Sequence, residues 1–260
     1  MITAYDYINT IIQIFVMIYI QISLYKRTFI KERSIRLVFF FFAIVANLLS
    51  ELYWLAFDIL YPSSRMPFAA NEIGECAIFF SLAASIAFST GFFTPPAILE
   101  TIGACIFITA NVALWIAWSG EWIQDIITGI VVAYFFSKII KHIKQTGALS
   151  SFAWKILGMI CVLVIAANTA TFFADYALKK IYEMSVCFLM LSADLYFMIR
   201  TVLSLKRKET GVPVSLAFAS MGWNVLFLYM SEGVIYNMVN VFCSVSFLLM
   251  FLALVREPES

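Results

Sequence analysis

Long apolar segments, each of roughly twenty residues, fill almost the whole chain. A helix needs about 20 mostly apolar residues to cross the hydrocarbon core of a bilayer. On that rule the pattern predicts nine membrane-spanning helices joined by short polar turns. Their approximate ranges are 5–25, 36–61, 68–91, 97–118, 122–143, 152–176, 181–203, 214–230 and 233–255.

The last two predicted helices leave a second interpretation open. The segment 214–230 is short, and only Ser231, Glu232 and Gly233 separate it from the next apolar segment. Eight spanning helices with one re-entrant segment are therefore the alternative to a bundle of nine. Under either interpretation we expect an all-α polytopic membrane protein, in which residues 1–260 form one integral membrane domain and no separate soluble domain.

Polar residues interrupt these apolar segments in stripes rather than at random. Asn47, Glu51, Trp54 and Asp58 follow one another at intervals of four, three and four residues. At 3.6 residues per turn this spacing places them on one face of a helix. A carboxylate in hydrocarbon costs about 2.5–3.5 kcal/mol on insertion scales, so we expect this face to point away from lipid.

The next predicted helix carries Glu72 and Glu75, three residues apart and therefore neighbours on one face. Because a short turn makes the two helices antiparallel, Glu51 and Glu75 are predicted to lie at comparable depth. Facing each other, these two carboxylates could share one proton or one cation. Glu51, Glu75, Asn47 and Trp54 are accordingly predicted to bind a substrate or a cation.

Similar stripes recur in other predicted helices: Asp6, Asn9 and Gln13; Asn168 and Asp175; Glu183, Cys187 and Asp194; and Glu232, Tyr236, Asn240 and Cys243. Polar faces on many helices of one bundle favour convergence on a wet cavity. Most of the acids fall in the same half of their helices, which predicts an electronegative cavity open to the outside. The residues expected to add to its lining are Asn168, Asp175, Glu232, Tyr236 and Asn240.

Asp194 lies near the centre of the predicted helix 181–203, where an isolated charge is most expensive. It is the first choice for a residue that titrates or contacts a cation, with Glu51 second. The structural alternative is a neutral aspartic acid that is hydrogen-bonded to a neighbouring helix, since burial disfavours the charged form. The sequence leaves both interpretations open.

Other polar residues have simpler structural explanations. Asp58, Arg65 and Glu72 are expected to form a salt-bridge cluster at the membrane boundary, as are Asp175, Lys179, Lys180 and Glu183. Asn111, Asn168 and Asn224 are expected to join helices, and His142 is interpreted as a loop residue at the cytoplasmic surface.

Basic residues indicate the orientation, because Lys and Arg gather in short cytoplasmic loops. If the loop 26–36 is cytoplasmic, fourteen of the seventeen basic residues fall on that side, leaving only Arg65, Lys179 and Lys180 outside. The N-terminus is then predicted outside and the C-terminus in the cytoplasm. The basic segments 26–36 and 138–144 could dock a cytoplasmic partner, or they could serve orientation alone.

Composition agrees with the pattern and excludes several classes of function. The chain is 63% hydrophobic and 13% charged, and its mean hydropathy is +0.94, which predicts contact with a lipid bilayer. The basic residues form no tract that could neutralise phosphates, so no nucleic-acid role is expected. Five cysteines without a CxxC motif and a single histidine predict no zinc site, and no cofactor is predicted.

Two functions remain as the main hypotheses. The first is a small transporter or permease, in a plasma or bacterial inner membrane, whose outward-facing acidic cavity takes a cation, a proton or a small amine-like solute. The second is a sensory or receptor module that binds an external ligand and signals to a cytoplasmic partner. An intramembrane enzyme ranks third, because the sequence holds no HExxH, GxSxG or comparable catalytic motif.

Overall fold

The computed structural model describes residues 4–31, 34–61, 68–90, 98–119, 122–228 and 233–257. Within these ranges the predicted all-α class is confirmed: the described chain forms nine α-helices and one π-helix, with no strand. The elements are α1 (Ala4–Tyr25), η1 (Lys26–Lys31), α2 (Ile35–Leu60), α3 (Phe68–Thr90), α4 (Ile98–Ser119), α5 (Trp122–Thr146), α6 (Ser151–Thr171), α7 (Tyr176–Arg207), α8 (Val212–Leu228) and α9 (Gly233–Arg256).

Most helix ends fall within a few residues of the predicted positions, and α7 departs most. We predicted 181–203, whereas α7 has 32 residues. Its early start has a local cause, because the Asp175 side chain accepts a hydrogen bond from the Leu178 backbone N–H at 2.9 Å and caps the first turn. The helix ends at Arg207, because the next residue, Lys208, has a left-handed backbone (φ 56°).

The predicted loop 26–36 is largely helical instead. Residues Lys26–Lys31 continue α1 as a π-helix, a wide turn that occurs mostly in short pieces. The Phe29 ring meets the Phe41 ring of α2 edge-on, with centroids 5.3 Å apart. This contact holds the π-helix against α2. Hydrophobic periodicity does not predict such a contact, because the two rings are twelve residues apart.

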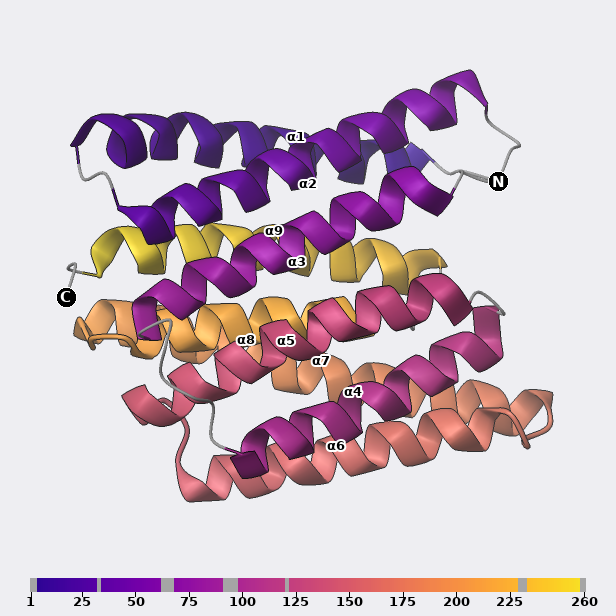
Figure 1. Ribbon diagram of the computed structural model, residues 1–260. Helices are drawn as coiled ribbons and strands as arrows, with labels where there is room; N and C mark the ends of the chain where they lie inside the picture. Colours follow the sequence, from indigo (N-terminus) through magenta and orange to yellow (C-terminus); the bar gives the residue numbers. More distant parts are fainter. Residues whose placement is uncertain are drawn as a thin grey trace.

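The helices lie roughly parallel or antiparallel in layers, with α1 and α2 at one side of the bundle and α4 and α6 at the other (Figure 1). Along the chain α1 packs on α2, α2 on α3, and α3 on α5. The centre belongs to α8, which contacts α5, α7 and α9. Every residue from Pro213 to Phe227 is buried, so α8 is enclosed by the other helices.

Six helices in the described ranges are long and apolar enough to cross a membrane: Tyr7–Ile30, Ile35–Leu60, Trp122–Thr146, Ser151–Thr171, Tyr176–Arg207 and Ile235–Arg256. Shorter apolar stretches occur in the remaining three, at Ile73–Ser89, Thr101–Ala117 and Val212–Leu228. Large apolar side chains cover much of the outer surface, for example Phe15, Phe152 and Phe188, each at least two-thirds exposed. This composition and surface are those of a membrane-embedded protein.

Candidate functional site

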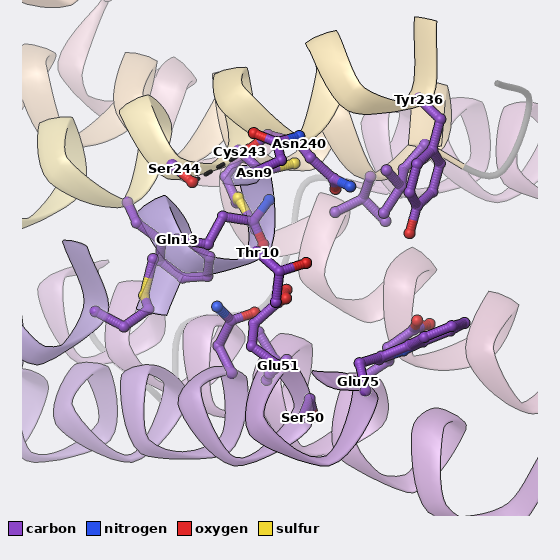
Figure 2. A pocket seen from close by; sticks show the side chains of 18 of the residues that line it. Asn9, Thr10, Gln13, Ser50, Glu51, Glu75, Tyr236, Asn240, Cys243 and Ser244 are labelled. Atoms are coloured by element: carbon purple, nitrogen blue, oxygen red, sulfur yellow. Dashed lines mark hydrogen bonds between the residues drawn. The ribbon is translucent and has the colours of Figure 1, made fainter. Parts of the chain in front are cut away.

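A cavity of about 400 Å³ lies between α1, α2, α3, α8 and α9, toward the end of the bundle at which α1 begins. Figure 2 shows polar side chains entering it from α1, α2, α3 and α9. Helix α8 closes it with the apolar residues Met221, Val225 and Leu228. The polar lining consists of Asn9, Thr10, Gln13, Asn47, Ser50, Glu51, Trp54, Asp58, Glu75, Tyr236, Asn237, Asn240 and Ser244.

The acidic wall of this cavity comes from α2 and α3. Glu51 and Glu75 both line it and are close enough to interact electrostatically. Close packing of the two helices makes this possible: at Gly74 an added Cβ would collide with the Ser50 hydroxyl. Because Gly74 precedes Glu75 and Ser50 precedes Glu51, the point of closest approach carries both carboxylates to the same cavity.

The opposite wall is built from amides and hydroxyls of α1 and α9. Asn9 Nδ2 donates to the backbone carbonyl of Asn237 at 2.8 Å and to its Oδ1 at 3.3 Å, which ties α1 to α9. Ser244 Oγ donates to the Asn240 carbonyl at 3.2 Å. In Figure 2 Tyr236 extends from α9 toward the side of the cavity on which Glu75 lies. Acids therefore face neutral donors and acceptors across the cavity.

The structure brings together most of the residues singled out in the sequence. Glu51, Glu75, Asn47, Trp54, Tyr236 and Asn240 all line this cavity. Glu232 lies outside the described residues, as do the side chains of Asp6 and Glu72.

Asn168 and Asp175 do not line this cavity. Asn168 is on α6, which packs against α4 and α7 rather than against α1, α2 or α9. Asp175 is the exposed cap of α7 described above. Near it, Lys179 and Glu183 form an exposed ion pair at 3.7 Å, one turn apart on the helix. The contacts of Asp175, Lys179 and Glu183 described here are therefore with α7 itself.

Asp194 occupies a separate position at the junction of α7, α8 and α9. Its side chain is fully buried, at 0% exposure. Ser220 Oγ of α8 donates to Asp194 Oδ1 at 2.5 Å and lies 2.8 Å from Ser246 Oγ of α9. Asn224 Nδ2 donates to Ser246 Oγ at 3.0 Å. Asp194 is therefore hydrogen-bonded to a neighbouring helix, in a polar network outside the cavity.

Only a thin layer separates this network from the cavity. Cys243 of α9 lines the cavity and interacts electrostatically with both Asp194 and Glu51. Ser246, which belongs to the network, is one residue from Phe247, which belongs to the cavity lining. The two polar regions thus meet α9 at neighbouring positions along the helix.

Some cavity residues were missed or discounted in the sequence. Asp58, which we assigned to a boundary salt-bridge cluster, lines the cavity. Its position seven residues after Glu51 was the available signal, because seven residues are close to two full turns. Asn237 and Ser244 share a helical face with Asn240 and could have been found by the same spacing.

The end of the bundle opposite the cavity is closed by buried polar contacts. Arg36, 8% exposed, donates through Nη2 to the Glu257 carbonyl at 2.5 Å and to the Leu254 carbonyl at 3.4 Å. Its Nη1 pairs with Glu257 Oε2 at 3.4 Å. Ser85 Oγ of α3 donates to the Arg36 carbonyl at 2.9 Å. These bonds fasten α2 and α3 to the C-terminal end of α9.

Our interpretation of His142 as a surface loop residue is wrong. His142 lies inside α5 and is 3% exposed, and its Nδ1 is 2.6 Å from Ser215 Oγ of α8. Thr146 Oγ1 lies 2.8 Å from the same hydroxyl. Lys138 and Lys141 are buried as well. The segment 138–144 belongs to the last part of a packed helix. Its basic residues favoured the interpretation as a surface loop.

No family model matches the chain, and no curated protein or solved structure matches it. In the described part of the chain, no three His, Cys, Asp or Glu side chains are grouped so as to hold a metal ion.

Proposed function

We propose that the protein is a small permease in a plasma or bacterial inner membrane, with nine spanning helices and an acidic cavity open to the outside. Six helices of sufficient length and three shorter apolar ones support that count. The alternating helices and the basic residues near one end support an external N-terminus and a cytoplasmic C-terminus. The cavity then lies in the outer half of the bundle.

The observation that carries this proposal is the composition of the cavity wall. Glu51, Asp58 and Glu75 line a space of about 400 Å³, a volume within the range of small-molecule sites. Carboxylates in a concave, partly apolar site focus a negative potential that concentrates cations. Amide and hydroxyl oxygens opposite them can accept hydrogen bonds from an ammonium group. A small amine-like cation fits this chemistry.

The same pair of acids suggests how binding and release are controlled. Two neighbouring carboxylates repel each other, and a proton or a cation between them removes that repulsion. The closure around Arg36 at the cytoplasmic end supports an outward-open state, in which solute enters from outside only. Transport then requires that this closure opens after the acidic cavity has been filled.

A test uses the purified protein in liposomes, with radiolabelled methylammonium as the solute and a trapped dye that reports internal pH. We expect uptake above that of empty liposomes and at least a tenfold loss in Glu51→Gln and Glu75→Gln. Glu183→Gln is the matched control, because Glu183 is exposed and forms an ion pair only within α7. Absence of uptake, or equal uptake by all three variants, would refute the permease.

The sensory alternative uses the same cavity and needs a cytoplasmic surface for its partner. Of the basic groups in 138–144, Lys138 and Lys141 are buried and Lys144 is exposed. A buried segment makes a poor docking surface, so this observation favours transport over signalling through that segment.

A further inference from the structure

We propose that Asp194, Ser220, Asn224 and Ser246 form a binding site for one dehydrated Na⁺, separate from the acidic cavity. The inference extends the proposed permease by giving it a coupling ion. It rests on the hydrogen-bond arrangement of these four side chains and on the uncompensated charge of the carboxylate.

The Asp194 carboxylate has no cationic partner in the described part of the chain. Asp194 is fully buried, and no Lys or Arg in the described ranges forms an ion pair with it. A buried carboxylate with neither a cationic partner nor a proton is strongly unfavourable. Something of positive charge is therefore required at this position when Asp194 is ionised.

The hydrogen bonds show where that charge would go. The Asn224 amide donates to Ser246, the Ser246 hydroxyl is left to donate to Ser220, and Ser220 donates to Asp194 Oδ1. Each serine has a single proton, and this chain uses both. Two fully buried oxygens have no hydrogen-bond partner: Asp194 Oδ2 and Asn224 Oδ1. The network therefore contains two hydrogen-bond acceptors without a donor, and it contains no positively charged group.

The two unpartnered oxygens belong to neighbouring side chains, because the Asn224 amide also donates a hydrogen bond to the Asp194 carboxyl. Carboxylate, amide and hydroxyl oxygens are the ligands that hard cations take. One carboxylate balances one charge, which favours a monovalent ion over Ca²⁺ or Mg²⁺. A proton on Oδ2 would need a single acceptor, whereas the network joins oxygens of α7, α8 and α9 and leaves two of them without a partner.

The position suits a coupling ion. The four residues come from α7, α8 and α9, so an ion among them draws the three helices together. Cys243 and Phe247 of α9 line the cavity, and Cys243 also interacts electrostatically with Asp194. An ion in the Asp194 network would change the electrostatic potential and the packing at the acidic cavity, and a solute in the cavity would do the same to the network. The two sites would therefore be energetically coupled.

The test measures the melting temperature of the purified full-length protein in detergent, with NaCl replaced by KCl or N-methylglucamine chloride at constant ionic strength. We expect Na⁺ to raise Tm saturably, by about 2–4 °C, and the other cations to have little effect. The Na⁺ shift should be lost in Asp194→Asn and reduced in Ser246→Ala, which keeps the carboxylate. Ser192→Ala should retain it, because Ser192 is exposed on α7 and bonds only to its own helix.

Other outcomes overturn the site. If acid raises Tm in the wild type but not in Asp194→Asn, and Na⁺ has no effect, the carboxyl holds a proton. If neither acid nor Na⁺ matters, the network is a sealed helix junction. Wild-type uptake separates this inference from the proposed function: a Na⁺ shift in a wild-type protein that takes up no methylammonium would refute the permease and leave the site standing. In Glu51→Gln the Na⁺ shift should persist, because Glu51 is not among the four residues of the site.

Discussion

At the scale of single residues, Glu257 shows a charge held at the edge of the bundle. Burial raises the pKa of its carboxyl above the ordinary value, although the Arg36 guanidinium and a hydrogen bond with the Gly211 backbone act in the opposite direction. The folded protein therefore takes up a proton at Glu257 more readily than the unfolded chain does. Stability from this residue is fully present below the unfolded pKa and is lost as pH rises through the folded pKa.

Glu257→Gln should accordingly be at least as stable as the wild type at neutral pH. Its advantage in Tm should shrink as the pH falls through the raised pKa of Glu257 and should vanish below about 4.5, where Glu257 is neutral in both states. Thermal unfolding in detergent between pH 4 and 7.5 measures the difference. A variant that is less stable at neutral pH, with the gap closing in acid, would reverse the sign and contradict the argument.

Sequence reasoning at this scale succeeded where chain neighbours decide geometry. The approach of Glu51 to Glu75 followed from one short turn, and both line the cavity. The partners of Asp194 were beyond reach, because Ser220 and Ser246 are 26 and 52 residues away and meet it only through the packing of three helices. Spacing assigns a residue to a face, but it does not say which helix that face meets.

At the scale of elements, glycine fixes where helices touch. An added Cβ at Gly129 of α5 would collide with the Val112 side chain of α4. At Gly103 of α4 the same addition meets nothing within 4 Å. Two glycines on helices that pack together thus have opposite roles, and neither role is visible in the sequence.

Gly129→Ala should lower the stability by about 1–3 kcal/mol, since overpacking forces α4 away from α5. Gly103→Ala is the matched control and should be neutral or slightly stabilising, because alanine favours helix by about 1 kcal/mol over glycine. Thermal unfolding of both variants in the same detergent compares them. Equal melting temperatures would mean that α4 and α5 are not in tight contact at Gly129.

Helix positions were largely predictable because about twenty apolar residues are a strong and local signal. The departures have local causes that hydropathy does not register: a capping aspartate at α7, a ring contact at η1, and a buried histidine in α5. In each case a polar or aromatic side chain has a specific partner: the Leu178 N–H, the Phe41 ring and the Ser215 hydroxyl.

At the scale of the whole molecule, the contacts of Arg36 lie at the end of the bundle opposite the cavity. Arg36 donates to two backbone carbonyls near the end of α9, so this closure depends less on the Glu257 carboxylate than on the guanidinium. Its removal would leave buried carbonyls without a donor and free α2 from α9 at this end of the bundle, which the proposed function places in the cytoplasm. The proposed transport cycle requires such an opening.

Arg36→Met should therefore let water reach the cavity from the cytoplasmic side. A cysteine placed by Ser50→Cys, in a chain without the five native cysteines, reports this by labelling with a membrane-impermeant maleimide. When Arg36 is present, we expect the reagent to label this cysteine only from the outside. In Arg36→Met we expect labelling from both sides of the membrane. Lys155→Met, at an exposed position of α6, is the control. Unchanged sidedness in Arg36→Met would show that these bonds do not form the closure.

The enclosure of α8 bears on how the protein assembles. Ribosomes complete α8 before α9, yet the finished protein gives the residues from Pro213 to Phe227 no contact with lipid. During synthesis α8 must therefore rest beside lipid or the insertion machinery with Ser220 and Asn224 still lacking Ser246. Arrival of α9 supplies that missing partner and covers the helix. Chains that stop short of α9 should thus be recognised as unfinished and degraded, even with eight helices already in place.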